Sequence, residues 1–282
     1  MSSPADSTAG SAIRRSRDVL RVVGPDSRTY LQGQLSQDVD VLAVGGSADT
    51  FVLQPTGKVE AWMRVSRVAD DTFVLDVDKG WGERVLARLI RFLLRTDCIV
   101  ETVDWELVTV LDPGSETLQA PTGGLAITVA WPGLNAVDLL GPEVVVPAGL
   151  HEVDGSVWEY RRIAAGIPVM GAEMDNTTIP GATGVVDRSA SFTKGCYTGQ
   201  ELVARVDSRS AGAPTRIVRA IGNGPSPRPG TNITAEGASA GRLTSVAMAP
   251  DGVFVALAEV RRAVSVPATV YADGTPVSLV AD

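Results

Sequence analysis

An octapeptide in the second half of the chain brings a thiol, an amine and a carboxylate close together. It reads Lys194-Gly195-Cys196-Tyr197-Thr198-Gly199-Gln200-Glu201. A cysteine thiolate is a nucleophile or a metal ligand, and a neighbouring ammonium lowers the pKa of the thiol. Thr198 and Glu201 have the spacing of a capping box, which predicts a helix that runs through Val206. Cys196 would then lie just before the helix N-terminus, where backbone N–H groups and the helix dipole favour the thiolate.

Several residues of the octapeptide have two interpretations. By spacing alone, an ordinary loop-to-helix junction with a buried, inert cysteine is favoured, because short motifs often match by chance. Glu201 fits a structural cap better than a ligand contact, whereas Tyr197 either stacks on an aromatic ligand or packs in the core. Arg205 lies four residues after Glu201, the spacing of a salt bridge on one helix face.

Composition limits the kinds of site that the chain can build. Its 282 residues carry a net charge of −8, which argues against a broad basic surface, so we expect no direct nucleic-acid binding. Cys98 and Cys196 are the only cysteines, and His151 is the only histidine. These counts argue against a zinc site of the usual type and against a four-cysteine iron–sulfur site, so we expect no metal. Cys98 lies beside Ile99 and Val100 and is expected to be a packed core thiol.

The N-terminal segment and the cysteine usage bear on location. Residues 1–12 are small and polar, and we expect a disordered tail there. No apolar run approaches the length that crosses a membrane. The lack of a disulfide framework favours the cytoplasm, and the lack of a coiled-coil pattern favours a monomer. We expect His151, in a stretch rich in proline and glycine, to be an exposed loop residue.

The elements that must position the octapeptide mix helices and strands without regular βαβ alternation, which predicts an α+β fold. The clearest helix is Lys79–Arg95, whose apolar residues recur at helical spacing. Its arginines predict a solvated face, and Arg95 is the one best placed to turn inward toward an anionic group. Ser156 is a candidate cap for a helix that ends at Gly166.

Strands are expected on both sides of these helices. Beyond Pro214, short strands separated by glycine and proline turns predict a small β-barrel. The expected strands are 18–23, 49–53, 59–68, 72–77, 98–102, 105–111, 125–129, 136–140, 216–221, 241–247, 252–257, 268–271 and 276–280.

Four segments together resemble the YgfZ family of folate-binding proteins, relatives of the aminomethyltransferase (T-protein) of the glycine cleavage system. The octapeptide, KGCYTGQE, is similar to the signature of that family. The other three segments are Val22–Val39, Gln54–Val59 and Arg161–Pro168. The octapeptide is highly specific, whereas the other three segments also fit the wider aminomethyltransferase superfamily.

The resemblance implies a GcvT-like ring of two ferredoxin-like α+β domains and a C-terminal β-barrel around a central folate channel. We therefore assign residues 13–213 to a folate-binding α+β region with two interleaved subdomains, and residues 214–282 to the barrel. The implied cofactor is tetrahydrofolate or a one-carbon derivative. The implied folate contacts are Gln34, Asp38, Arg95, Gly195, Tyr197, Gln200, Glu201 and Arg205.

The resemblance also implies a function. It is the maturation or repair of iron–sulfur enzymes, including some that modify tRNA, with those clients or their assembly proteins as partners. The catalytic residue of the signature is its cysteine, here Cys196, and Lys194 would polarise the site or hold an anionic group. A thiolate that attacks a one-carbon or persulfide group and a transient metal ligand both remain open.

Two other functions compete with this one. A true aminomethyltransferase relies on a carboxylate near the start of the helix at 79–95 and on a glutamate near the loop at 175–180. The chain offers only Glu83, off register, and Ala182 at these places. The third hypothesis is a non-catalytic folate-binding scaffold, in which Cys196 is a packing or redox residue.

Overall fold

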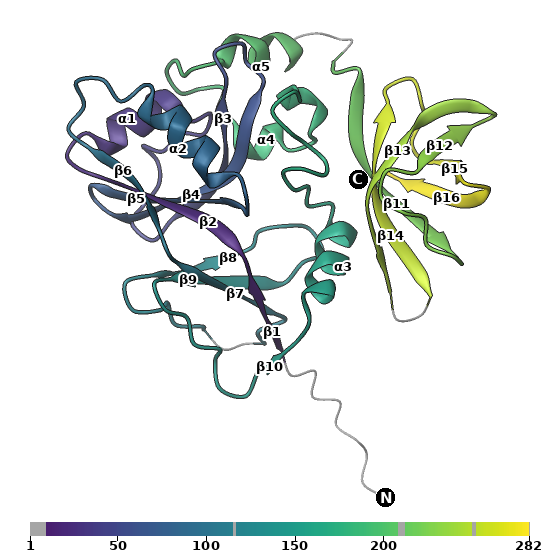
Figure 1. Cartoon of the computed structure of the whole chain (residues 1–282), viewed down its shortest axis with the longest axis horizontal. Coiled ribbons are helices and arrows are strands. Elements are labelled where there is room, and N and C mark those ends of the chain that lie inside the picture. The colour runs from purple at the N-terminus through teal and green to yellow at the C-terminus, as the bar shows by residue number, and fades with distance from the viewer. Residues whose placement is uncertain (1–9, 115–116, 208–211, 250–251, 282) are drawn as a thin grey trace, which may run out of the picture.

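The structure, a computed structural model, describes residues 10–114, 117–207, 212–249 and 252–281, without the side chains of residues 204–207. It contains two five-stranded sheets and a closed barrel, joined by helices and loops (Figure 1), which confirms the predicted α+β class and the C-terminal barrel. The elements are β1 (Ser11–Arg15), β2 (Arg17–Val23), α1 (Ser27–Gln34), β3 (Ser47–Leu53), β4 (Val59–Ala69), β5 (Thr72–Asp78), α2 (Gly82–Ile90), β6 (Ile99–Val103), β7 (Glu106–Leu111), β8 (Leu125–Thr128), β9 (Ala136–Gly141), β10 (His151–Glu152), α3 (Gly155–Ala165), the 3-10 helix η1 (Pro180–Ala182), α4 (Val186–Ser189), α5 (Gln200–Asp207), β11 (Thr215–Asn223), β12 (Asn232–Ala235), β13 (Ala238–Met248), β14 (Val253–Arg261), β15 (Ala268–Ala272) and β16 (Thr275–Val280).

The first sheet has the strand order β3-β4-β5-β2-β6, and α1 and α2 share its core. The helix predicted at Lys79–Arg95 is shorter than expected, since α2 covers only Gly82–Ile90. Its start is fixed by strand β2, because the carboxylate of Asp18 accepts hydrogen bonds from the N–H groups of Gly80 and Gly82. After the last helical residue, the N–H groups of Phe92 and Leu93 bond to carbonyls three residues earlier, which makes the turns tighter than those of the helix. Arg95 then adopts a φ of 55°.

The second sheet has the order β10-β1-β7-β9-β8. Only Ser16 separates β1 of this sheet from β2 of the first, so one nearly continuous strand links the two sheets (Figure 1). Residues 1–9 lie outside the described residues, but the predicted tail of residues 1–12 is too long, because Ser11 starts β1 and Ala12 is fully buried. His151 is exposed as predicted, yet it pairs with Ser11 in β10 and does not lie in a loop.

Helix α3 packs between the second sheet and the barrel. Its N-cap is Asp154, whose side chain accepts a hydrogen bond from the N–H of Ser156, so the predicted cap was two residues late. Gly166 ends the helix in the left-handed conformation, as predicted, with a φ of 82°. Ile163 packs against the outer face of the barrel at Val255 and Leu257.

A buried polar cluster also joins α3 to the barrel. Arg162 of α3 and Ser245 of β13 both contact Glu173, whose side chain is fully buried. The barrel itself has the order β11-β14-β13-β12-β15-β16. Its strands match the predicted ones except for β12, a four-residue strand that the sequence did not reveal. Among the described residues, no helix has the length and apolar character needed to cross a membrane.

Candidate functional site

The octapeptide precedes and begins helix α5, but not in the predicted register. The helix starts at Gln200, so its N-cap position is Gly199 and not Thr198, one residue later than the predicted capping box requires. The N–H of Thr198 instead donates to the carbonyl of Gly33 in α1. Cys196 consequently lies one residue farther from the helix N-terminus than expected.

Cys196 opens onto a pocket of about 390 Å³. Its side chain is exposed, which rules out the buried, inert thiol that spacing alone had favoured. The pocket is lined by Pro55, Thr56, Gly57, Cys196, Tyr197, Gly199, Gln200, Glu201 and Leu202. Gly57 and Gly199 face each other so closely that a Cβ on Gly199 would lie 2.7 Å from the carbonyl oxygen of Gln54. These two glycines therefore allow the hairpin before β4 to pack directly on the octapeptide.

Lys194 is buried on the other side of the octapeptide. Its ammonium donates to the carbonyls of Leu35 and Gln37, at 2.9 and 2.7 Å. Within the part of the chain that the structure describes, no hydrogen bond joins Lys194 to Cys196. Burial lowers the pKa of the Lys194 ammonium to about 8, although the nearby charges of Asp38 and Asp40 partly oppose this shift.

The other predicted folate contacts are divided between the octapeptide and more distant places. Gln34 accepts a hydrogen bond from Arg88, and Asp38 accepts one from Gln32. Gly195 is exposed beside the pocket residues Tyr197, Gln200 and Glu201. Tyr197 is buried, which raises the pKa of its hydroxyl to about 12, and its packing favours the core interpretation.

Arg95 does not turn inward as predicted, because it lies beyond the end of α2 and is exposed. The arginine of α2 that turns inward is Arg88, which is 7% exposed and donates to the carbonyl of Leu53. The side chain of Arg205 lies outside the described residues.

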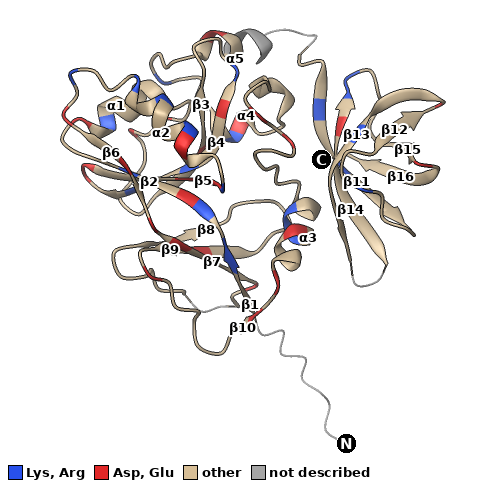
Figure 2. Ribbon diagram, viewed as in Figure 1, with Lys and Arg blue, Asp and Glu red and all other residues tan. Residues whose placement is uncertain are grey.

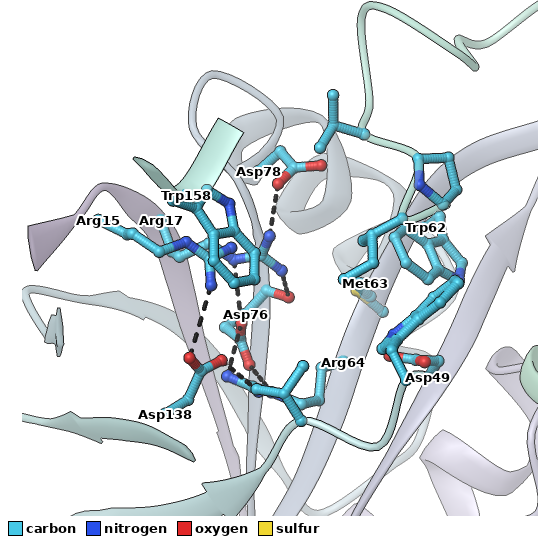
Figure 3. Close-up of a pocket in the computed structure, with 15 residues that line it drawn as sticks. Arg15, Arg17, Asp49, Trp62, Met63, Arg64, Asp76, Asp78, Asp138 and Trp158 are labelled. Carbon is cyan, nitrogen blue, oxygen red and sulfur yellow. Dashed lines mark hydrogen bonds and ion pairs between the residues drawn. The ribbon is translucent and has the colours of Figure 1, made fainter. Parts of the chain in front are cut away.

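A second candidate site lies where the two sheets meet, and the sequence did not reveal it. Basic and acidic residues gather there, close to the point where β1 runs into β2 (Figure 2). Three half-buried arginines and three aspartates, two of which are buried, form one network of ion pairs beside the tryptophans (Figure 3). The network consists of Arg15, Arg17, Arg64, Asp76, Asp78 and Asp138.

Arg64 is the centre of this network. It donates to Asp76 and to Asp138, each at 2.8 Å. Burial by itself would raise the pKa of Asp138, but Arg64, Arg15 and the hydroxyl of Thr109 hold it below its ordinary value. Burial lowers the pKa of Arg15 to about 10, and this guanidinium stacks 3.6 Å above the centre of the Trp158 ring.

Three neighbouring spaces here have Trp131 in their lining, and we call them together the central cavity. The middle part measures about 60 Å³ and is bordered by Trp62, Trp131 and Trp158. Two larger parts, of about 440 and 350 Å³, also have Trp131 in their lining. Arg188 borders both larger parts, stacks 3.7 Å above the ring centre of Trp131 and donates to Asp49 at 2.7 Å.

The 440 Å³ part carries positive charge. Its described lining residues include Arg161, Arg188 and Arg219 and no acidic residue, although Arg161 pairs with Asp112 and Arg188 with Asp49. In a protein with a net charge of −8, this concentration of guanidinium groups favours an anionic ligand.

Comparison with known proteins identifies the family. No protein-family model matches the chain. A protein of Haemophilus influenzae described only as uncharacterized is 32% identical over 195 residues, which cover 68% of this chain and 67% of that protein. The tRNA-modifying protein YgfZ of Cronobacter sakazakii is 27% identical over 257 residues, which cover 81% of this chain and 76% of that protein. The chain belongs to the YgfZ/GcvT-like family.

The fold of this family member agrees with a solved structure. The aminomethyltransferase T of the glycine cleavage system from Bartonella henselae matches with a TM-score of 0.81 and 18% sequence identity. The match covers 97% of this chain and 85% of that one. It confirms the GcvT-like fold predicted from the octapeptide and its companion segments.

Proposed function

We propose that this protein binds tetrahydrofolate, or a one-carbon derivative, in the central cavity. We further propose that it supports the maturation or repair of iron–sulfur enzymes, including some that modify tRNA, through Cys196. The observation that carries the proposal is the meeting of three tryptophans with a network of arginines and aspartates at the centre of a GcvT-like fold. The relative from Cronobacter sakazakii is a tRNA-modifying protein by name, which supports the link to tRNA.

The lining of the central cavity fits such a ligand chemically. Trp62 and Trp131 offer flat apolar surface to a heteroaromatic ring. Asp49 accepts one hydrogen bond from Arg188, and a carboxylate has about four acceptor sites, which leaves capacity for the N–H groups of a pterin. Arg161 and Arg219 supply positive charge for the carboxylates of a glutamyl tail.

The available volume also fits. The two larger parts of the cavity, about 440 and 350 Å³, fall within the range of about 300–1,000 Å³ that is typical of ligand pockets. The middle part, about 60 Å³, is too small for a pterin on its own. Tetrahydrofolate, when bound, supplies a carrier for one-carbon groups.

Cys196 would act at a separate place. Its pocket shares no lining residue with the central cavity. An exposed thiol beside a pocket of about 390 Å³ suits reaction with a group that a partner protein presents. The two chemical roles considered for the thiol, nucleophile and transient metal ligand, both require that exposure.

Aminomethyl transfer is the alternative, because the solved aminomethyltransferase T shares the fold. Glu83 is exposed in the first turn of α2. Ala182 stands in η1 where a glutamate was expected. Neither position supplies a carboxylate to the central cavity, so we favour the iron–sulfur role.

Replacement of Cys196 tests the proposed function in cells that lack the protein. Cys196→Ala should fold and bind tetrahydrofolate but fail to restore the activity of iron–sulfur enzymes. Cys98→Ala is the matched control, because Cys98 is a buried core thiol, and it should restore activity. Full restoration by Cys196→Ala would contradict a chemical role for the thiol and support the scaffold hypothesis.

A further inference from the structure

The segment Leu35–Gln37, directly after α1, is fixed to the edge of the first sheet. The N–H of Ser36 donates to the carbonyl of Phe51, and the hydroxyl of Ser36 accepts from the N–H of Phe51 at 2.8 Å. The N–H of Gln37 donates to the hydroxyl of Thr50 at 3.1 Å. Leu35 and Ser36 are fully buried. These bonds make the segment a rigid platform between β3 and whatever contacts its other side.

One contact of this platform leads to the wall of the central cavity. The hydroxyl of Ser36 donates to the carbonyl of Ser189 at 2.6 Å. The hydroxyl of Ser189 in turn accepts from the indole N–H of Trp62 at 2.8 Å. The side-chain amide of Gln37 donates to the carbonyl of Arg188 at 3.0 Å. Trp62 and Arg188 both line the cavity, so displacement of either side chain reaches the platform through the backbone of Arg188 and Ser189.

The opposite contact leads to the segment that carries Cys196, residues 191–199. The ammonium of Lys194 bonds to the carbonyls on both sides of Ser36, those of Leu35 and Gln37. The N–H of Ser191 donates to the carbonyl of Ser36 itself. Lys194 is 9% exposed, and a buried ammonium costs free energy unless it is hydrogen-bonded. Its bonds to these carbonyls therefore fix the position of residues 191–199 against the platform.

We infer that Lys194 is a positioning residue that couples occupancy of the central cavity to the order of the segment carrying Cys196. A ligand held against Trp62 and Arg188 restrains Ser189 and the platform, and the platform restrains Lys194. The coupling is reciprocal, so a partner that engages Cys196 strengthens binding in the cavity. This inference rests on the proposed function, because it takes tetrahydrofolate as the cavity ligand.

Hydrogen exchange of the backbone amides in residues 191–199, followed by mass spectrometry, tests the coupling. In the wild type, saturating tetrahydrofolate should slow this exchange by at least about threefold, since ordering lowers the population of open states. Lys194→Met should bind tetrahydrofolate with similar affinity, measured separately by fluorescence, but lose the slowing. Lys194→Arg keeps a charged donor and should restore part of it. Lys58→Met is the matched control, since Lys58 is exposed, and it should behave as the wild type.

A second part of the experiment, the Trp62→Phe arm, needs no ligand. Trp62→Phe removes the bond to Ser189 from the cavity side, and it should speed exchange in residues 191–199 by at least about threefold. The inference is overturned if Lys194→Met binds and keeps the slowing, or if the wild type binds without any slowing. If tetrahydrofolate does not bind at all, the proposed ligand is wrong, and the Trp62→Phe arm alone decides the coupling: unchanged exchange there overturns it.

Discussion

The indole N–H of Trp62 donates a 2.8 Å hydrogen bond to the hydroxyl of Ser189, 127 positions later in the chain. Both side chains are buried, Ser189 completely. The bond ties strand β4, in the wall of the central cavity, to helix α4, which leads into the octapeptide.

Loss of the Ser189 hydroxyl should destabilise the protein. Ser189→Ala leaves the Trp62 indole N–H buried without a partner, which costs about 1–3 kcal/mol of unfolding free energy. Urea unfolding followed by circular dichroism measures this loss. Ser226→Ala, on an exposed barrel loop, should change the free energy by less than about 0.5 kcal/mol. Equal values for the two variants would show that the buried bond contributes nothing.

Removal of Arg64 should have a larger effect. Arg64→Met leaves Asp76 and Asp138, which are 1% and 3% exposed, without their shared cation. Breaking a buried ion pair from one side typically costs about 3–5 kcal/mol. Arg242→Met, at an exposed pair with Glu259, should cost at most about 1 kcal/mol. Calorimetric melting of both variants distinguishes them, and a small effect for Arg64→Met would contradict a network held by its charges.

The same network predicts a dependence of stability on acid. The pKa of Asp138 is lower in the folded protein than its ordinary value of 3.8, so the unfolded chain binds the proton more tightly. Stability from this group is complete above about pH 4 and is lost as pH falls through the folded pKa. Asp138→Asn should therefore flatten the fall in unfolding free energy below about pH 4. An unchanged acid profile in Asp138→Asn would contradict this assignment.

The two cysteines should differ in reactivity toward iodoacetamide. Cys196 is exposed, whereas Cys98 is 9% exposed and burial raises the pKa of its thiol. At pH 7.5, Cys196 should be alkylated at least about tenfold faster than Cys98, because the thiolate is the reacting species and needs access. Peptide mass spectrometry resolves the two sites. Similar alkylation rates for the two cysteines in the native protein would contradict the packing of Cys98.

The sequence predicted elements better than it predicted their ends. The apolar period of the helix at 79–95 found α2, but the helix begins where Asp18, far away in sequence, accepts its first N–H groups. Spacing placed the cap of α3 at Ser156, although Asp154 was an equally good capping type two residues earlier. The four-residue strand β12 is stabilised by pairing with β13 on one side and β15 on the other. The local sequence pattern does not predict these pairings.

The octapeptide was found from its residues, but the central cavity was not. Arg64, Asp76 and Asp138 come from three strands, and only the tertiary fold brings them together. A local signal did exist, since Asp76 interrupts the apolar run of β5 in a strand whose neighbours are buried. A buried aspartate of that kind requires a partner, which the sequence alone does not identify.

Lys194 shows a second limit of sequence reasoning. Its position two residues before Cys196 suggested that the ammonium acts on the thiol. The side chain instead reaches the carbonyls of Leu35 and Gln37, nearly 160 positions earlier in the chain. Proximity along the chain did not decide the direction of a long, flexible side chain.

Direct titration with tetrahydrofolate tests the proposed ligand. Three of the five tryptophans line the central cavity, so binding should quench tryptophan fluorescence saturably at micromolar concentration and raise the melting temperature. Arg188→Met should weaken binding by at least about tenfold, as expected for loss of a charged contact, whereas Arg228→Met, on an exposed barrel loop, should not. Absence of both quenching and a thermal shift up to millimolar tetrahydrofolate would contradict the account.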